Sequence, residues 1–124
     1  MNLVDSCGWL EYVADGPNAD FFMSPIKNSS KLIVPTICIF EVFKRLHVQR
    51  GEDIAMRAVS GMRRGLVIEL DSQTAVIAAK LSVDLKLPMA DSIILATARA
   101  YKAVIWTQDK DFKGIDGVEY IEKK

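Results

Sequence analysis

Residues 88–98 predict a helix that is apolar on almost every side, and a helix of this kind normally packs inside a domain. Asp91 is the exception, because it shares the most buried stripe with Ile94, Leu95 and Ala98 at the spacing i, i+3, i+4, i+7. An ionised carboxylate on such a stripe is costly unless donors or a positive charge meet it. Three interpretations are open for Asp91: an N-cap, a partner for a buried Arg or Lys, or a ligand that binds a cation together with other acids.

The composition suits one domain, which we expect to span residues 1–124, because 50% of the 124 residues are hydrophobic. No apolar run approaches the ~18 residues that cross a bilayer, and the first residues do not resemble a signal peptide. We therefore expect a cytoplasmic protein without membrane contact. The formal net charge of zero argues against bulk electrostatic binding of nucleic acid.

A local excess of positive charge lies between residues 44 and 64, which include six basic and two acidic residues. This stretch is either the solvated face of two helices or a patch that binds phosphates. The chain has one histidine, His47, and two distant cysteines, Cys7 and Cys38. A histidine zinc site and a thiolate site are excluded, so any metal site must use oxygen ligands.

Short apolar runs alternate with helical segments, which predicts an α/β fold with a parallel sheet and helices on both faces. We expect strands at residues 1–4, 32–34, 66–70, 104–106 and 118–121. We expect helices near residues 9–13, 19–28, 36–51, 52–64, 72–87 and 90–102. Local signals add that Thr36 and either Asp71 or Ser72 are N-caps, that Gly51 ends a helix, and that Ala78, Leu81 and Leu85 form a core stripe.

Four acids fall at the ends of these elements. Asp5 and Asp109 each follow a predicted strand, Asp91 begins a helix, and Glu41 lies in the second turn of another helix. Ligands of open α/β sheets bind at the carboxyl ends of the strands, and hard cations bind carboxylate oxygens, so these acids could converge on a divalent metal. The local alternatives are that Asp5 only caps the next helix and that Glu41 forms an i, i+4 surface pair with Arg45.

The acids lie in four segments, which read LVDS (residues 3–6), PT…FEV (35–42), MADSIILATA (89–98) and TQDKDF (107–112). In sequence and order they resemble the four acidic motifs of PIN-domain ribonucleases, most of all the VapC-type toxins. The resemblance implies a PIN-like three-layer α/β/α sandwich with a central parallel sheet of about five strands. It also implies an endoribonuclease that depends on Mg²⁺ or Mn²⁺ and cleaves RNA through metal-activated water. Such toxins are usually homodimers that a cognate antitoxin holds inactive.

The resemblance also assigns roles to residues. The four catalytic acids are matched by Asp5, Glu41, Asp91 and Asp109, of which Asp5, Asp91 and Asp109 are the expected metal ligands. Asp111 is an alternative for the fourth acid, and Thr107 and Ser6 match small hydroxyl residues that line the site. The expected contacts to RNA phosphates are Lys44, Arg45, Lys110 and Lys113.

Two other functions remain open at this point. A catalytically silent PIN-like module would bind RNA or protein, although it would be expected to lack some of the acids. A phospho-acceptor receiver-like domain would use Asp71 after the third strand. The large apolar side chains of Trp9, Phe21, Phe22 and Met23 are expected to help close a symmetric dimer, unless they complete the core instead.

Overall fold

Five parallel strands form a single sheet in the order β3-β2-β1-β4-β5, as seen in a computed structural model that describes residues 1–124. The strands are β1 (Asn2–Val4), β2 (Leu32–Pro35), β3 (Leu66–Ile68), β4 (Val104–Thr107) and β5 (Val118–Tyr120). The helices are α1 (Ser6–Val13), α2 (Ala19–Lys27), α3 (Thr36–Arg50), α4 (Glu52–Met62), α5 (Ser72–Leu85) and α6 (Met89–Ala100), with short 3-10 helices η1 (Ser29–Lys31) and η2 (Lys110–Phe112).

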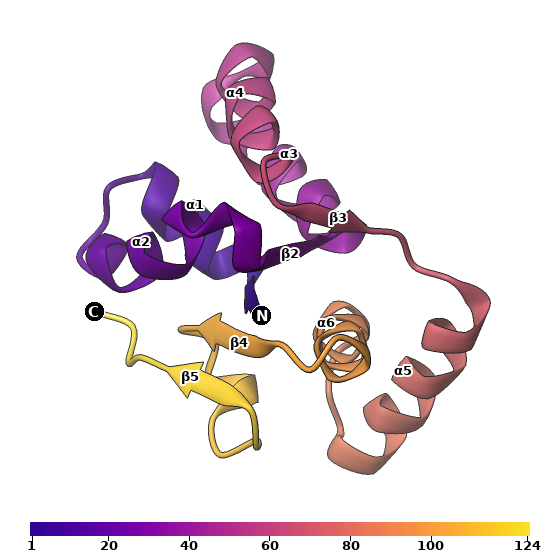
Figure 1. Cartoon of the computed structure of the whole chain (residues 1–124). Coiled ribbons are helices and arrows are strands. Elements are labelled where there is room, and N and C mark those ends of the chain that lie inside the picture. Colours follow the sequence, from indigo (N-terminus) through magenta and orange to yellow (C-terminus); the bar gives the residue numbers. More distant parts are fainter.

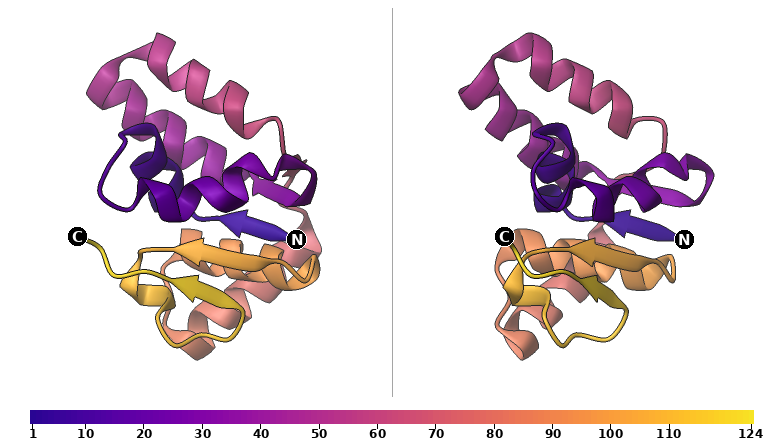
Figure 2. Two further views of the ribbon diagram at one scale, coloured as in Figure 1. Left: turned by 60° about the vertical axis from the view of Figure 1, so that its left-hand side comes forward. Right: turned by 90° about the vertical axis from the view of Figure 1, so that its left-hand side faces the viewer.

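The sheet separates two groups of helices, so the predicted three-layer α/β/α sandwich is confirmed. Helices α1 to α4 lie on one face and α5 and α6 on the other (Figures 1 and 2). The central strand β1 pairs with β2 on one side and with β4 on the other. Its residues Leu3 and Val4 are fully buried, as are Ile33 and Val34 of β2, which is typical of a parallel sheet covered on both faces.

Helix α6 is buried all round, as its sequence predicts. Eight successive residues, from Asp91 to Ala98, are buried because α6 packs against α5, α3 and β4. Helix α5 covers it from outside and has only one buried residue, Ala78. The predicted core stripe of α5 is therefore wrong at Leu85, which is 43% exposed. Leu85 is the last residue of α5, whose extensive contacts are with α6.

Two of the predicted helix ends are confirmed and one is wrong. Asp71 caps α5 by accepting a 2.7 Å hydrogen bond from the backbone N–H of Thr74, and Gly51 ends α3 with a φ of 91°. Thr36 is not an N-cap, because β2 continues to Pro35 and the helix begins directly after it. The extended Pro35 occupies the cap position and provides no side-chain hydrogen bond.

The expectation that N-terminal aromatic side chains close a dimer is wrong for Trp9 and Phe22. Trp9 is 3% exposed and Phe22 is fully buried, and both belong to the main core cluster. Phe21 packs edge-on against Phe22 with the ring centroids 5.0 Å apart. These side chains complete the core between α1, α2 and the sheet.

Among the helices, none combines the length and the hydropathy that a membrane span requires.

Gly8 lets α1 lie close to α2 and β1. A Cβ atom at this position would lie 2.6 Å from two ring atoms of Phe22 and 2.8 Å from Cγ1 of Val4. We expect Gly8→Ala to lower the free energy of unfolding by about 1–3 kcal/mol, because the buried ring and β1 must shift to admit the methyl group. Urea denaturation would measure this loss.

Gly61→Ala is the matched control, because nothing lies within 4 Å of the Cβ position at Gly61 in α4. There the same substitution should raise the free energy of unfolding by about 0.5–1 kcal/mol through helix propensity. Equal effects at Gly8 and Gly61 would contradict the close packing of α1.

Candidate metal centre

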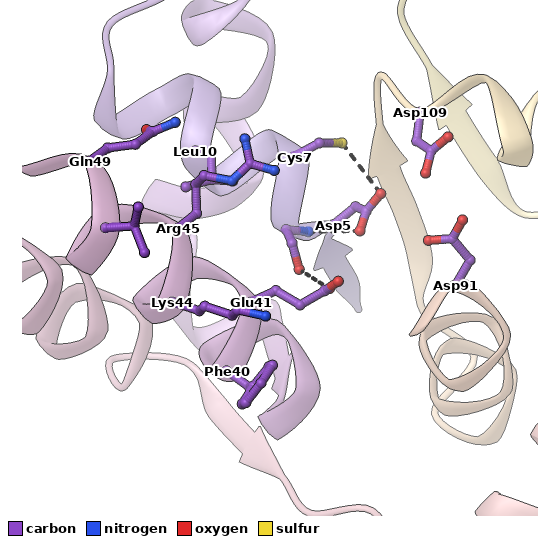
Figure 3. A pocket seen from close by; sticks show the side chains of 12 residues that line it. Asp5, Cys7, Leu10, Phe40, Glu41, Lys44, Arg45, Gln49, Asp91 and Asp109 are labelled. Atoms are coloured by element: carbon purple, nitrogen blue, oxygen red, sulfur yellow. Dashed lines mark hydrogen bonds between the residues drawn. The ribbon is translucent and has the colours of Figure 1, made fainter. Parts of the chain in front are cut away.

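Three of the predicted acids come together at the carboxyl-terminal edge of the sheet. Asp5 follows β1, Asp109 follows β4 by two residues, and Asp91 is the third residue of α6. Because β1 and β4 are neighbours and parallel, their carboxyl ends lie side by side. One carboxylate oxygen of each residue lies within 4.8 Å of the other two (Figure 3).

Asp5 is held in place by three hydrogen bonds and is only 3% exposed. Its Oδ1 accepts a 2.7 Å bond from the backbone N–H of Ser6, so it caps α1 as the local alternative proposed. Its Oδ2 accepts bonds from the hydroxyl of Thr107 at 2.8 Å and from the thiol of Cys7 at 3.3 Å. Capping and membership of the acid cluster are thus compatible for Asp5.

Thr107 connects two of the acids. Its hydroxyl is fully buried, donates to Asp5 and accepts a 2.9 Å bond from the backbone N–H of Asp109. Asp109 in turn accepts a 2.9 Å bond from the backbone N–H of Asp111 and is the N-cap of η2. Asp111 is exposed and lies outside the group of three, so the geometry favours Asp109 as the fourth acid of the sequence motifs.

Asp91 has neither of the partners that the two structural interpretations require. Pro88 occupies the N-cap position of α6, and the side chain of Asp91 makes no capping hydrogen bond. It also has no basic partner, since the one ion pair in the chain joins Lys113 to Glu122. The residue is only 9% exposed. Of the three interpretations, a cation bound together with other acids is the one that the structure leaves open. Its place in the first turn of α6 also puts it at the positive end of the helix dipole.

The electrostatics of the cluster suit the binding of a cation. Burial raises the pKa of Asp5 to about 6, against the hydrogen bonds from Thr107, Cys7 and Ser6. Burial, followed by the charges of Asp5 and Asp109, raises the pKa of Asp91 to about 8. A divalent cation would favour the ionised forms of all three carboxylates. Three convergent carboxylates that form no ion pair with a basic side chain are a donor set suited to Mg²⁺ or Mn²⁺.

Glu41 lies beside the cluster and not within it. Its Oε1 accepts a 2.7 Å hydrogen bond from the hydroxyl of Ser6. The alternative of a surface pair between Glu41 and Arg45 is wrong, because α3 directs Glu41 toward α1 and no ion pair forms (Figure 3). A cavity of about 630 Å³ joins these groups and is lined by Asp5, Ser6, Cys7, Leu10, Phe40, Glu41, Lys44, Arg45, Val48, Gln49, Asp91 and Asp109.

The four basic residues expected to contact phosphates divide into three environments. Lys44 and Arg45 line the large cavity, with Nζ of Lys44 5.8 Å from the ring centroid of Phe40. Lys110 lines a second cavity on the other side of Asp109. Lys113 lines neither cavity, and its Nζ lies 3.6 Å from a carboxylate oxygen of Glu122.

Two residues at or next to the site could not be assigned to it from the sequence. Cys7 contacts both Asp5 and Thr107, although in the sequence it is an isolated cysteine. Asn18 is 2% exposed and donates 2.9 and 3.0 Å hydrogen bonds to Oε1 of Gln108 and to the carbonyl of Glu122. It thereby holds the segment next to Asp109, across 90 residues of sequence. The place of Phe40 in the cavity could have been predicted from the sequence, because it precedes Glu41 and lies four residues before Lys44 on α3.

Comparisons with known proteins show a family and several structures that this chain resembles. The PIN domain family model matches residues 3–118. A toxin–antitoxin complex from Klebsiella pneumoniae matches with a TM-score of 0.84 at 22% identity, covering 99% of this chain and 100% of that chain. VapC20 of Mycobacterium tuberculosis, described as a toxin that cleaves the sarcin–ricin loop, matches at 0.79 and 14% identity, covering 94% and 95%. DNA-bound VapBC from Salmonella typhimurium matches at 0.74 and 17%, covering 98% of each chain. No curated protein gives a significant sequence match.

Replacing Asp91 with Asn tests the cluster through stability. The substitution keeps the shape and removes a carboxyl that the cluster holds protonated in the folded protein although it ionises freely in the unfolded chain, so the metal-free protein should gain about 0.5–2 kcal/mol at neutral pH. Mn²⁺ should stabilise the wild type by RT ln(1 + [L]/Kd), about 2.7 kcal/mol at a hundredfold excess over Kd, and Asp91→Asn should lose most of this. Thermal melts with and without Mn²⁺ measure both effects.

Asp111→Asn is the matched control, because Asp111 is exposed and outside the group of three. It should keep the metal-induced shift of the wild type. An equal shift in the wild type and Asp91→Asn would remove Asp91 from the metal site. A lost shift in Asp111→Asn would make Asp111 a ligand.

The raised pKa values of Asp5 and Asp91 also predict how stability depends on pH. Both carboxyls keep their protons to higher pH in the folded protein than in the unfolded chain, where the pKa of Asp is about 3.9. The unfolded state therefore binds fewer protons between about pH 4 and pH 8, and the metal-free protein should lose stability as pH rises through this window. Urea midpoints from pH 4 to pH 8 in EDTA would show the slope, and Asp91→Asn should flatten its upper part.

Proposed function

The chain belongs to the PIN-domain family, and on that premise we propose that it is a Mg²⁺- or Mn²⁺-dependent endoribonuclease, the toxin of a toxin–antitoxin pair. The observation that carries the proposal is the convergence of Asp5, Asp91 and Asp109 without a compensating charge, at one end of a cavity that also has basic side chains. The structural matches add support, because the Klebsiella pneumoniae protein comes from a toxin–antitoxin complex and VapC20 is a toxin that cleaves the sarcin–ricin loop.

Asp5, Asp91 and Asp109 would hold the cation. When bound, it would supply activation of the attacking water and charge compensation at the cleaved phosphodiester. The protein groups around it have separate tasks. Thr107 fixes the orientation of Asp5 through its 2.8 Å hydrogen bond and fixes the backbone of Asp109 through its 2.9 Å bond. Precise positioning of ligands by such neighbours strengthens metal binding.

Glu41 is the candidate proton acceptor. Its Oε1 is engaged by Ser6 at 2.7 Å, and its Oε2 has no partner within the protein. Glu41 thus lines the cavity with one oxygen free to accept a proton from water, and the sole histidine, His47, does not line this cavity. Lys44 and Arg45, on the same face of α3, would bind RNA phosphates next to the cleaved one.

The alternative functions receive less support from the site. A silent binding module would not need three carboxylates held together against their mutual repulsion. A receiver-like domain would need Asp71 as an accessible phospho-acceptor in an acidic pocket. Asp71 instead engages the backbone of Thr74 as the N-cap of α5, and it lines neither of the two main cavities.

Three partners belong to this proposal: an RNA substrate, a cognate antitoxin and a second copy of the chain. The antitoxin is supported by matches to toxin–antitoxin complexes from three bacteria. A homodimer would have to use side chains outside the core. Val76 and Val83 of α5 are 58% and 78% exposed, and Met89 at the start of α6 is 71% exposed, so apolar surface is available there.

Metal-dependent cleavage of structured RNA is the direct test. The purified protein should cleave ribosomal or transfer RNA in Mn²⁺ or Mg²⁺, should lose this activity in EDTA, and should regain it when metal is restored. Asp91→Asn, purified in parallel, should lower cleavage at least 100-fold, which controls for contaminating nucleases. Undiminished cleavage in EDTA would reject the mechanism, because no histidine or activated thiol lines the site as a substitute.

A further inference from the structure

We propose that RNA crosses the acid cluster from one cavity into another, and that Lys110, Tyr120 and Lys123 form a second nucleotide subsite over β4 and β5. This inference rests on the proposed ribonuclease function and adds to it the path of the substrate. The first subsite is the cavity that Phe40, Lys44 and Arg45 line; the second lies on the far side of Asp109.

The second cavity has a volume of about 440 Å³, which is within the range of small-molecule sites. It is lined by Cys7, Gln108, Asp109, Lys110, Tyr120, Glu122 and Lys123. Cys7 and Asp109 also line the first cavity, so the two cavities meet at the acid cluster. A polynucleotide with its cleaved bond at the cluster must continue on both sides, and each side then has a cavity.

The sheet order explains why the cavities lie in line. The first cavity uses residues after β1 and from α3, which follows β2; the second uses residues after β4 and from the end of β5. These strands are neighbours in the order β2-β1-β4-β5 and are all parallel. Three strand spacings of about 4.8 Å make a continuous edge of roughly 14 Å. An extended RNA strand can therefore run along one edge of the sheet.

Two lysines of the second cavity are free to contact phosphates. Neither Lys110 nor Lys123 takes part in an ion pair. The carboxylate in the same cavity, Glu122, is already compensated: Lys113 lies 3.6 Å from its Oε1, and the hydroxyl of Tyr120 donates a 2.8 Å bond to its Oε2. Lysines with free ammonium groups beside the cleaved phosphate would bind the RNA backbone without sequence preference.

Tyr120 adds a surface on which a base can stack. Its hydroxyl is fixed by Glu122, and Nζ of Lys113 lies 5.7 Å from the ring centroid. These two contacts orient a half-buried ring at the wall of the cavity. An aromatic ring near lysines is the combination that single-stranded nucleic acid sites use. Phe40 with Lys44 repeats it in the first cavity, where the ring is 61% exposed.

The test compares RNA truncation with side-chain replacement. The cleaved bond is first mapped on ribosomal or transfer RNA, and an oligoribonucleotide around it is then shortened on one side or the other. Tyr120→Leu should lower kcat/KM on the full oligonucleotide by about 5- to 100-fold, as expected when a stacked base is lost. The same substitution should have almost no effect on one of the two shortened oligonucleotides. The flank that this oligonucleotide lacks is the one that occupies the second cavity. Phe40→Leu should show the opposite flank dependence.

Matched controls separate this role from a loss of structure. Tyr120→Phe keeps the ring but removes its hydrogen bond to Glu122, so it should lower kcat/KM less than Tyr120→Leu does. Tyr101→Leu and Lys80→Gln change an exposed tyrosine and lysine that line neither cavity, and they should cleave like the wild type. Lys123→Gln should reduce the slope of log Kd against log salt by about 0.7 when a labelled single-stranded RNA binds Asp91→Asn. Equal losses on both truncated oligonucleotides, or no loss at all, would overturn the second subsite.

The readouts also keep the two proposals apart. If the wild type binds RNA but does not cleave it, and Tyr120→Leu and Lys123→Gln weaken that binding, the ribonuclease proposal fails and the second subsite stands. If the wild type cleaves and these variants match it, the subsite fails and the ribonuclease stands. Unchanged RNA binding together with weaker binding of a protein partner would assign the second cavity to a protein interface and overturn the subsite. The absence of RNA binding and cleavage would overturn both.

Discussion

Three carboxylates that would repel one another lie within 4.8 Å, and much of the fold serves to hold them there. The parallel pairing of β1 with β4 brings Asp5 and Asp109 to the same edge of the sheet. The hydroxyl of Thr107 then joins the two, since it donates to one and accepts from the backbone of the other. The third, Asp91, is placed by α6, whose next seven residues are all buried. Apolar packing of α6 therefore offsets the cost of burying its acid.

The layers of this fold could be predicted from the sequence, because apolar runs and helical segments each follow a local rule. All five strands lie where the runs predict them, and α6 is apolar all round because it is covered on every side. The order of the strands needs contacts between distant residues, such as the pairing of Leu3 with Ile105 and Ile33, which no local pattern contains. The same limit explains why the predicted burial of Leu85 is wrong. Its spacing from Ala78 and Leu81 fits a helical stripe, but α6 covers only part of α5.

The candidate site was less accessible to local reasoning. An acid at a helix start gives the same pattern whether it caps the helix, pairs with a base or binds a cation. The geometry separates these three roles. Asp91 makes no capping hydrogen bond and has no basic partner, whereas Asp71 is an N-cap that accepts a hydrogen bond from Thr74. Asp5 has two of these roles at once, because it caps α1 and also belongs to the acid cluster. The resemblance to PIN-domain motifs identified the acids as a set, but it could not identify Asn18, which acts across 90 residues of sequence.

The distribution of charge gives a physical reason for the proposed dependence on metal. The chain has 16 basic and 16 acidic residues but only one ion pair, so its cations are not consumed by its acids. Basic side chains line cavities on both sides of the cluster, whereas the cluster itself contains only carboxylates. Phosphates held by Lys44 on one side and Lys123 on the other would place the phosphate between them against Asp5, Asp91 and Asp109, whose ionised forms would repel it. Like charges at such distances repel strongly in a partly desolvated crevice. On the proposed function, a cation between the central phosphate and the acids would remove this repulsion, so the same cation would assist both the binding of RNA across the cluster and its cleavage.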